Sequence, residues 1–300
     1  MKFAIAVITA LVCARAHAQT VLLSPRNYTV DLENRNSYVG ALLIVAEPDN
    51  ALGVPPAIYA MASGALIHER VFLAAGHSVG PSLPALPPGI KAYVTFSPQA
   101  RDRSKWILAG TQVVHPTMPP CGPPFGCDPT TTNAFKAGDP LISDLGLVFL
   151  TVPARGIEPA KLASPGLLEK RPTAGDRMTT VGYGHPFPGP GNTSPPVSAR
   201  DGFRKYRESR LDRVLNERWA AWELPSAVCY GDSGSPTLYD PLPRNPKSQK
   251  AIVAIASDGG ADCLSTDLRS RVDTGIVQQW IKATVREHLG EQAALSLVNE

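Results

Sequence analysis

The chain has 300 residues, of which 43% are hydrophobic, and a formal net charge of +3. This hydrophobic content is sufficient for a packed core, and so small a charge argues against a protein that binds nucleic acid or an anionic membrane surface. Proline accounts for 30 residues, about twice the usual share, so we expect many loops and few long helices.

The N-terminus contains the three parts of a secretory signal peptide. Lys2 precedes an apolar stretch from Phe3 to Cys13, and Ala16-His17-Ala18 follows as an Ala-x-Ala cleavage site. The apolar stretch is shorter than the roughly 20 residues that cross a bilayer, and the cleavage site argues against an uncleaved anchor. We therefore expect cleavage after Ala18, a segment over residues 19–37 that is a candidate propeptide, and an exported protein. It would be secreted, or periplasmic in a Gram-negative bacterium.

Short apolar runs follow, separated by Gly, Pro, Asn and Asp. Their lengths and boundaries predict β-strands. In the first half of the chain the predicted strands are Val39–Ala46, Ala57–Ile67, Val71–Ala75, Lys91–Phe96, Trp106–Val114 and Leu145–Val152. Two proline-rich insertions, Pro81–Pro88 and Pro116–Thr132, predict surface loops.

The strand pattern resumes after a connecting stretch near Ala154–Pro165. Between the strands of this second cluster lies the charged run Arg204–Arg213, which mixes both signs. This mixture favours a solvated loop or exposed face over a binding patch. The predicted strands of the cluster are Met178–Tyr183, Arg218–Leu224, Thr237–Tyr239 and Ala251–Ala256.

The last segment has a different period. Its apolar residues recur every 3.6 positions, which predicts an amphipathic helix over 274–290 that Gly290 ends, followed by a tail over 291–300. The apolar positions are Ile276, Val277, Trp280, Ile281, Val285 and Leu289. The pattern as a whole predicts two clusters of short strands and one terminal helix.

The cysteines predict disulfides. Cys13 leaves with the signal peptide, and an even number in an exported chain favours two bridges over free thiols. The four that remain are Cys121, Cys127, Cys229 and Cys263, for which the sequence allows three pairings. A metal site at Cys121 and Cys127 is the rival interpretation, but no His or Cys partner stands at a useful spacing, so no metal is expected.

Three short segments carry residues suited to acyl transfer. Ser233 lies in Gly231-Asp232-Ser233-Gly234, His77 follows an apolar strand, and Asp144 stands at the head of another. A serine nucleophile needs an adjacent base, and the developing oxyanion needs backbone N–H donors, which a glycine-rich turn can present. Each segment alone also has an ordinary explanation: a turn, a structural histidine, or a turn-capping aspartate.

Together these segments resemble the chymotrypsin-type serine proteases, in which the histidine, aspartate and serine occur in this order. Ala74–Ser78 is similar to the family's Ala-Ala-His-Cys motif with a glycine inserted before the histidine, and Ser143–Leu147 is similar to Asp-Ile-Ala-Leu. Cys229–Pro236 is similar to Cys-x-Gly-Asp-Ser-Gly-Gly-Pro. Weaker matches are Ala62–Ile67 to Cys-Gly-Gly-Ser-Leu-Ile, Thr180–Gly184 to Val-x-Gly-Trp-Gly, Ile252–Gly259 to the strand ending in Ser-Trp-Gly, Arg271-Val272, and Trp280-Ile281.

The resemblance implies an all-β fold of two six-stranded antiparallel β-barrels with a C-terminal amphipathic helix. The protease domain would span 38–282, with barrels at about 38–153 and 154–273. Ser233 would attack the scissile carbonyl, His77 would act as base and then acid, and Asp144 would orient His77. The N–H groups of Gly231 and Ser233 would form the oxyanion hole. The family pattern also pairs Cys229 with Cys263, which leaves Cys121–Cys127 as the second bridge.

The substrate-binding residues implied by the resemblance are Ala227, Tyr230, Ser257, Gly259 and Asp267. Ser257, Asp258 and Gly259 would present an edge along which substrate pairs like an added strand. Ala227 at the expected pocket base points to an apolar first pocket. Asp267 and Arg269 could neutralise each other, Asp267 could attract a basic side chain, or both could be solvated.

The sequence allows two hypotheses for how the protease would be activated. Asp232 would pair with a freshly cut N-terminal ammonium, as is usual in the family, or with an internal arginine, and no clear activation cleavage site is present. We therefore predict a secreted, monomeric serine endopeptidase that acts on protein or peptide substrates without a cofactor. A non-catalytic binding module on the same fold is the alternative. An esterase of unrelated fold would need a Gly-x-Ser-x-Gly elbow with serine first in order, whereas Ser233 comes last.

Overall fold

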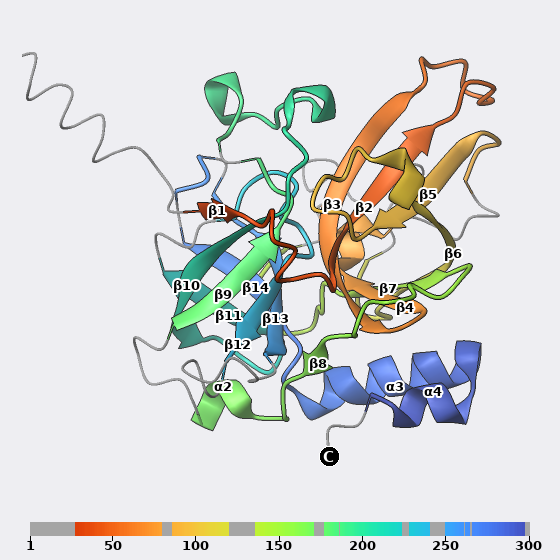
Figure 1. Ribbon diagram of the computed structural model, residues 1–300. Helices are drawn as coiled ribbons and strands as arrows, with labels where there is room; N and C mark the ends of the chain where they lie inside the picture. Colours follow the sequence, from red (N-terminus) through yellow and green to blue (C-terminus); the bar gives the residue numbers. More distant parts are fainter. Residues whose placement is uncertain are drawn as a thin grey trace, which may run out of the picture.

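The computed structural model describes residues 28–79, 86–119, 136–170, 177–185, 187–223, 228–240, 250–260, 262–264 and 266–297. The expected signal peptide, the Cys121/Cys127 pair and Ala227 lie outside these ranges. Within them the chain forms two closed β-barrels side by side, with the C-terminal helices packed below them (Figure 1). The predicted fold class is confirmed.

The first barrel closes in the strand order β2-β3-β4-β7-β6-β5, and all of its pairings are antiparallel. Its strands fall where the apolar runs predict them. They are β2 (Val39–Ala46), β3 (Ala57–His68), β4 (Val71–Ala74), β5 (Ile90–Thr95), β6 (Ile107–Val114) and β7 (Gly146–Leu150).

The second barrel is a ring in the order β10-β11-β14-β13-β12-β9, which the pairing of β9 with β10 closes. Two short strands attach to it from outside: β1 (Tyr28–Val30) pairs with β10, and β8 (Lys161–Leu162) pairs in parallel with β13. The ring strands are β9 (Arg177–Gly182), β10 (Lys205–Val214), β11 (Trp219–Glu223), β12 (Pro236–Tyr239), β13 (Ala251–Asp258) and β14 (Asp267–Arg271).

The charged run Arg204–Arg213 is not a loop, because most of it forms β10 with partners on both sides. The alternative of an exposed face holds for Glu208, Arg210 and Arg213 of this strand. Leu211 and Ser209 face inward, and the buried charges at its start find partners inside the protein. β14 was also missed by the sequence pattern. Its sequence, DLRSR, is polar, but Asp267 and Arg269 neutralise each other in the interior.

Every residue of β2 is buried, because its two faces serve different cores. Alternate residues such as Leu42 and Ile44 fill the interior of the first barrel. The intervening residues, such as Ala41 and Leu43, pack into a second cluster that reaches the second barrel and the terminal helix. This two-sided burial explains why β2 is a continuous apolar run and not an alternating one.

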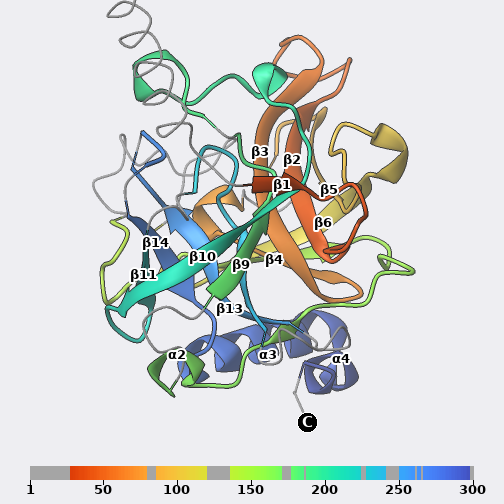
Figure 2. The ribbon, with the colours of Figure 1, turned by 60° about the vertical axis from the view of Figure 1, so that its left-hand side comes forward.

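The terminal helix α3 (Gly275–Leu289) is amphipathic, as predicted, and packs Val277, Ile281 and Val285 into the cluster shared by the two barrels. It ends at Gly290, whose φ is 89°. The stretch expected to be a tail contains a further short helix, α4 (Glu291–Leu295), and α2 (Leu167–Lys170) lies after β8. Figure 2 shows α3 and α4 below the barrels from a second direction. None of the helices in the described ranges is long and apolar enough to span a membrane.

A buried ion pair connects the segment before β2 to both barrels. Arg204 Nε donates to Asp31 Oδ2 at 2.9 Å, and neither side chain is exposed to solvent. The same guanidinium donates from Nη1 to the carbonyl oxygens of Val39 and Phe96. Asp31 also accepts the backbone N–H groups of Arg35 and Asn36. The carboxylate therefore fixes a turn and compensates a cation that water cannot reach.

We expect Asp31→Ala to lower the free energy of unfolding by about 3–5 kcal/mol, because it leaves the Arg204 cation buried without a counter-charge. Urea unfolding followed by circular dichroism measures the change. Glu33→Ala is the matched control, since it removes an ion pair with Arg35 that solvent surrounds, and its unfolding curve should overlay that of the wild type. Equal effects of the two variants would contradict the assignment.

Candidate functional site

His77 and Asp144 are brought together by the pairing of β4 with β7. Ala74 lies opposite Gly146, so the residues that follow β4 meet the residues that precede β7. His77 lies in the short 3-10 helix Gly76–Ser78. Its Nδ1 lies 2.7 Å from Asp144 Oδ2, and its backbone N–H donates to Asp144 Oδ1 at 2.8 Å. The carboxylate thus holds both the ring and the backbone of the histidine.

Gly76, the inserted glycine of the histidine motif, is required by this close approach. A Cβ at this position would lie 2.9 Å from the carbonyl oxygen of Leu145 and 3.2 Å from Asp144 Oδ1. Both distances are shorter than ordinary contacts of a methyl group with oxygen. A larger residue would therefore push the histidine turn away from the aspartate.

The surroundings favour an ionised Asp144 in contact with His77. Burial disfavours the carboxylate, but the charge and hydrogen bonds of His77 and the hydroxyl of Ser257 outweigh this, so the pKa of Asp144 lies below 3.8. Ser257 Oγ donates to Asp144 Oδ2 from the end of β13. Burial also disfavours the imidazolium of His77, yet Asp144 and, more weakly, Asp258 raise the pKa of His77 above 6.5.

Ser233 lies in a turn that depends on two glycines. Gly231 has φ +97° and Gly234 has φ +86°, values in the region that residues with a Cβ rarely adopt. Two backbone hydrogen bonds close the turn: the N–H of Asp232 donates to the carbonyl oxygen of Cys229, and the N–H of Ser235 donates to that of Asp232. The N–H groups of Gly231 and Ser233 donate to no acceptor within the described residues.

Ser63 holds this turn against the first barrel. Its N–H donates to the carbonyl oxygen of Ser233, and its hydroxyl donates to that of Gly231, both at 2.8 Å. The same hydroxyl accepts the N–H of Tyr183 from the second barrel. Ser63 was not predicted as a site residue, although a polar residue inside the apolar run of β3 is a signal for such a role.

The turn lies beside the histidine and the Ser257 end of β13. The N–H of Gly234 donates to Ala256 O at 2.8 Å, next to Ser257. A Cβ at Gly234 would lie 3.0 Å from the N atom of Ala75, two residues before His77. The three predicted catalytic segments therefore meet at the seam between the two barrels.

Asp232 accepts four hydrogen bonds and determines the shape of the turn. Oδ1 accepts the N–H of Gly184 and the hydroxyl of Ser235, and Oδ2 accepts the N–H of Cys229. Arg207 completes the set from β10, with Nη2 at 2.9 Å from Oδ2. Of the two sequence alternatives for Asp232, this structure has the internal arginine.

Two glycines make room for this carboxylate. A Cβ at Gly184 would lie 2.1 Å from Asp232 Cγ, and a Cβ at Gly182 would lie 2.6 Å from Asp232 Oδ1. Both belong to the segment Thr180–Gly184, which was noted for its motif but not assigned to the site. Spacing alone does not reveal that the two glycines face Asp232.

Several of the expected substrate-binding residues surround the turn. Cys229 and Cys263 form a disulfide with an S–S distance of 2.04 Å, the pair that the family resemblance implies. The Tyr230 hydroxyl donates to the carbonyl oxygen of Asn192. Gly259 lies close to Val228, since a Cβ there would be 3.1 Å from Val228 Cγ2.

Asp267 has no free charge to offer a substrate. It is fully buried, and Arg269 binds both of its oxygens through Nε and Nη2. Arg269 also stacks on Trp222, with its guanidinium carbon 4.7 Å from the ring centroid. Of the three sequence alternatives, the mutually neutralising pair is the one observed, and the solvated pair is excluded. Asp267 is thus not the residue that would attract a basic side chain.

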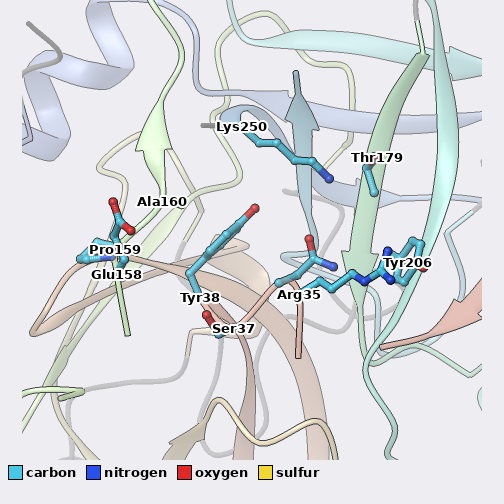
Figure 3. Close-up of a pocket in the computed structure, with 10 residues that line it drawn as sticks. Arg35, Ser37, Tyr38, Glu158, Pro159, Ala160, Thr179, Tyr206 and Lys250 are labelled. Atoms are coloured by element: carbon cyan, nitrogen blue, oxygen red, sulfur yellow. The ribbon is translucent and has the colours of Figure 1, made fainter. Parts of the chain in front are cut away.

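A separate groove of about 400 Å³ opens elsewhere along the seam, and Figure 3 shows residues that line it. It contains none of the predicted catalytic residues. Its lining is Arg35, Asn36, Ser37, Tyr38, Glu158, Pro159, Ala160, Thr179, Tyr206 and Lys250. Over the part of the chain that the structure describes, no group of three or more His, Cys, Asp or Glu side chains is placed to hold a metal ion.

Comparisons with known proteins support the fold but not an activity. No family model matches the sequence, and no curated protein matches it significantly. Among solved structures, 710 chains match significantly. One of them is described as the atomic-resolution structure of HBP, which has a chymotrypsin-like fold. It superposes with a TM-score of 0.54 and 14% identity, over 87% of this chain and 96% of that one. At this identity the likeness concerns the fold alone: the chain has a chymotrypsin-like fold.

Proposed function

We propose that the chain is an exported serine endopeptidase that cleaves protein or peptide substrates through an acyl-enzyme on Ser233. The observation that carries the proposal is the His77–Asp144 pair beside a turn whose Gly231 and Ser233 N–H groups donate to no acceptor among the described residues. A binding module would have no need of this combination. No specific observation favours the non-catalytic alternative.

In the proposed mechanism, Ser233 Oγ attacks the scissile carbonyl while His77 takes its proton, and Asp144 stabilises the imidazolium. The N–H groups of Gly231 and Ser233 bind the oxyanion. When the C–N bond breaks, His77 gives its proton to the leaving amine. Water then repeats the attack on the acyl-enzyme and releases the acid, which restores Ser233.

Export is part of the proposal. The Ala-x-Ala signal at Ala18 and the Cys229–Cys263 disulfide both fit an oxidising compartment outside the cytoplasm. The enzyme would work as a monomer and without a cofactor, since the reaction needs only the serine, the histidine–aspartate pair and the two N–H donors. Its first pocket would be apolar, because Asp267 is neutralised and Ala227 carries no charge.

Replacing Ser233 by alanine should abolish the activity while preserving the fold. We expect kcat to fall by a factor on the order of 10⁶, as removal of the nucleophile does in serine proteases. Cleavage of a peptide library, with products identified by mass spectrometry, measures the loss. A fluorescent organophosphonate should label the wild type and leave Ser233→Ala unlabelled. A folded wild type that resists the reagent and cleaves nothing would refute the proposal.

The pH dependence should report the His77–Asp144 pair. The base must be neutral, and the pKa of His77 is raised above 6.5, so kcat/KM should fall as the pH drops through a value above 6.5. The measurement is the pH profile of kcat/KM on a substrate without titrating groups, with circular dichroism confirming that the fold persists. An acid limb centred below 6.5 would contradict the assigned electrostatics.

Arg207 should be needed for activity through its contact with Asp232. Arg207→Gln removes a charged hydrogen bond worth about 1.5–3 kcal/mol, and we expect kcat/KM to fall by about 10- to 100-fold as the turn loses its shape. Arg213→Gln on the same strand is the control, because its ion pair with Asp212 is largely exposed. Its kcat/KM should stay within about twofold of the wild type. Full activity of Arg207→Gln would show that the turn does not depend on this arginine.

A further inference from the structure

Asp258 is the last residue of β13 and follows directly after Ser257, which binds the catalytic aspartate. The pairing of β13 with β14 shifts between Ala256 and Asp258, so Ser257 occupies a bulge without a partner in β14. In the Ser-Trp-Gly strand that Ile252–Gly259 resembles, an indole stands at this position. The carboxylate of Asp258 in place of this indole is therefore specific to this chain.

Asp258 forms no ion pair with Lys or Arg among the described residues. Its one hydrogen bond comes from the backbone N–H of Gly259, at 2.9 Å to Oδ1. The two neighbouring carboxylates have side-chain partners: Asp144 is held by His77 and Ser257, and Asp267 forms an ion pair with Arg269. Asp258 is exposed to solvent, and so to a ligand. Within the described ranges, the Asp258 carboxylate is thus the one of these three that no side chain binds.

The electrostatics place this charge close to the reactive centre. The Asp258 carboxylate contributes to the raised pKa of His77. Although the residue is exposed on one side, protein on the other partly desolvates it, and this raises the pKa of Asp258 above 3.8. The charges of Asp144 and Asp267 act in the same direction, against the opposing effects of Gly259 N–H and His77. A carboxylate whose ionised form is disfavoured in this way gains when a cation arrives beside it.

We propose that Asp258 is a specificity-determining residue, and that it selects substrates carrying a cationic nitrogen in the segment that lies along Ser257–Gly259. The cation is a lysine or arginine side chain, or a free N-terminal ammonium. This inference rests on the proposed function, because that function brings a peptide to this edge. Asp267 does not compete for the cation, since Arg269 already occupies both of its oxygens.

The test compares lysine with its neutral isostere norleucine. One peptide cleaved by the wild type is resynthesised with either residue at each of three positions before the scissile bond and two after it. At one position, lysine should raise kcat/KM by about tenfold, equivalent to about 1.4 kcal/mol. Acetylated and free N-termini in the same series distinguish a side-chain ammonium from an α-ammonium. A ratio near one at every position and terminus would overturn the proposal.

Variants assign the preference to the carboxylate. Asp258→Asn should bring the lysine-to-norleucine ratio to about one, and Asp258→Glu, which retains the charge, should restore part of it. Asp49→Asn removes the same charge from an exposed turn of the first barrel and should keep the wild-type ratio. A tenfold ratio that persists in Asp258→Asn would also overturn the proposal.

A binding experiment separates this inference from the proposed function. Ser233→Ala keeps Asp258, and fluorescence anisotropy measures how it binds the labelled lysine and norleucine peptides. Tighter binding of the lysine peptide, lost when Asp258→Asn is added, supports the inference even if the wild type cleaves nothing. Ser233-dependent cleavage with equal binding of both peptides would refute the inference and leave the proposed function standing.

Discussion

The carboxylate of Asp232 is the constraint on which the site depends. Its two oxygens take donors from three separate parts of the second barrel: Gly184 after β9, Arg207 in β10, and Cys229 and Ser235 in the turn itself. Four donors around one buried anion leave the turn little freedom, because any rearrangement would strand a charge without partners. The positive φ of Gly231 belongs to this fixed shape, in which the N–H groups of Gly231 and Ser233 meet no acceptor within the described ranges.

Strand pairing, and not the Asp232 carboxylate, positions the histidine and the aspartate. His77 and Asp144 are positioned by strand register, since the pairing of Ala74 with Gly146 places the end of β4 beside the start of β7. From the second barrel, Ser257 donates a hydrogen bond to Asp144, and Asp258 contributes at longer range to the raised pKa of His77. One barrel supplies the histidine–aspartate pair and the other supplies the turn and its charge balance, so the candidate site lies at the contact between the two barrels.

Much of this was predictable from the sequence, and the exceptions share a cause. The first barrel is bounded by clear turn residues and filled with apolar side chains, so its six strands could be read directly. β10 and β14 could not, because their polar residues are buried through pairings that the apolar pattern does not indicate. Lys205 pairs with Asp201, and Asp267 pairs with Arg269. Arg269 also donates to Thr180 and Thr237, which lie on other strands of the barrel. The motifs around His77, Asp144 and Ser233 were visible. The contributions of Ser63, Gly182, Gly184 and Arg207 were not, because each acts through a contact made only in the folded chain.

The position of Ser63 has a consequence for how the site comes into being. Its backbone and hydroxyl grip both ends of the Gly231–Ser233 turn from β3, while Tyr183 reaches the same hydroxyl from the opposite barrel. Each barrel can complete its own hydrogen-bonded ring without the other, but neither by itself retains a fully braced turn. The fully braced turn therefore exists only when the two barrels are docked against each other.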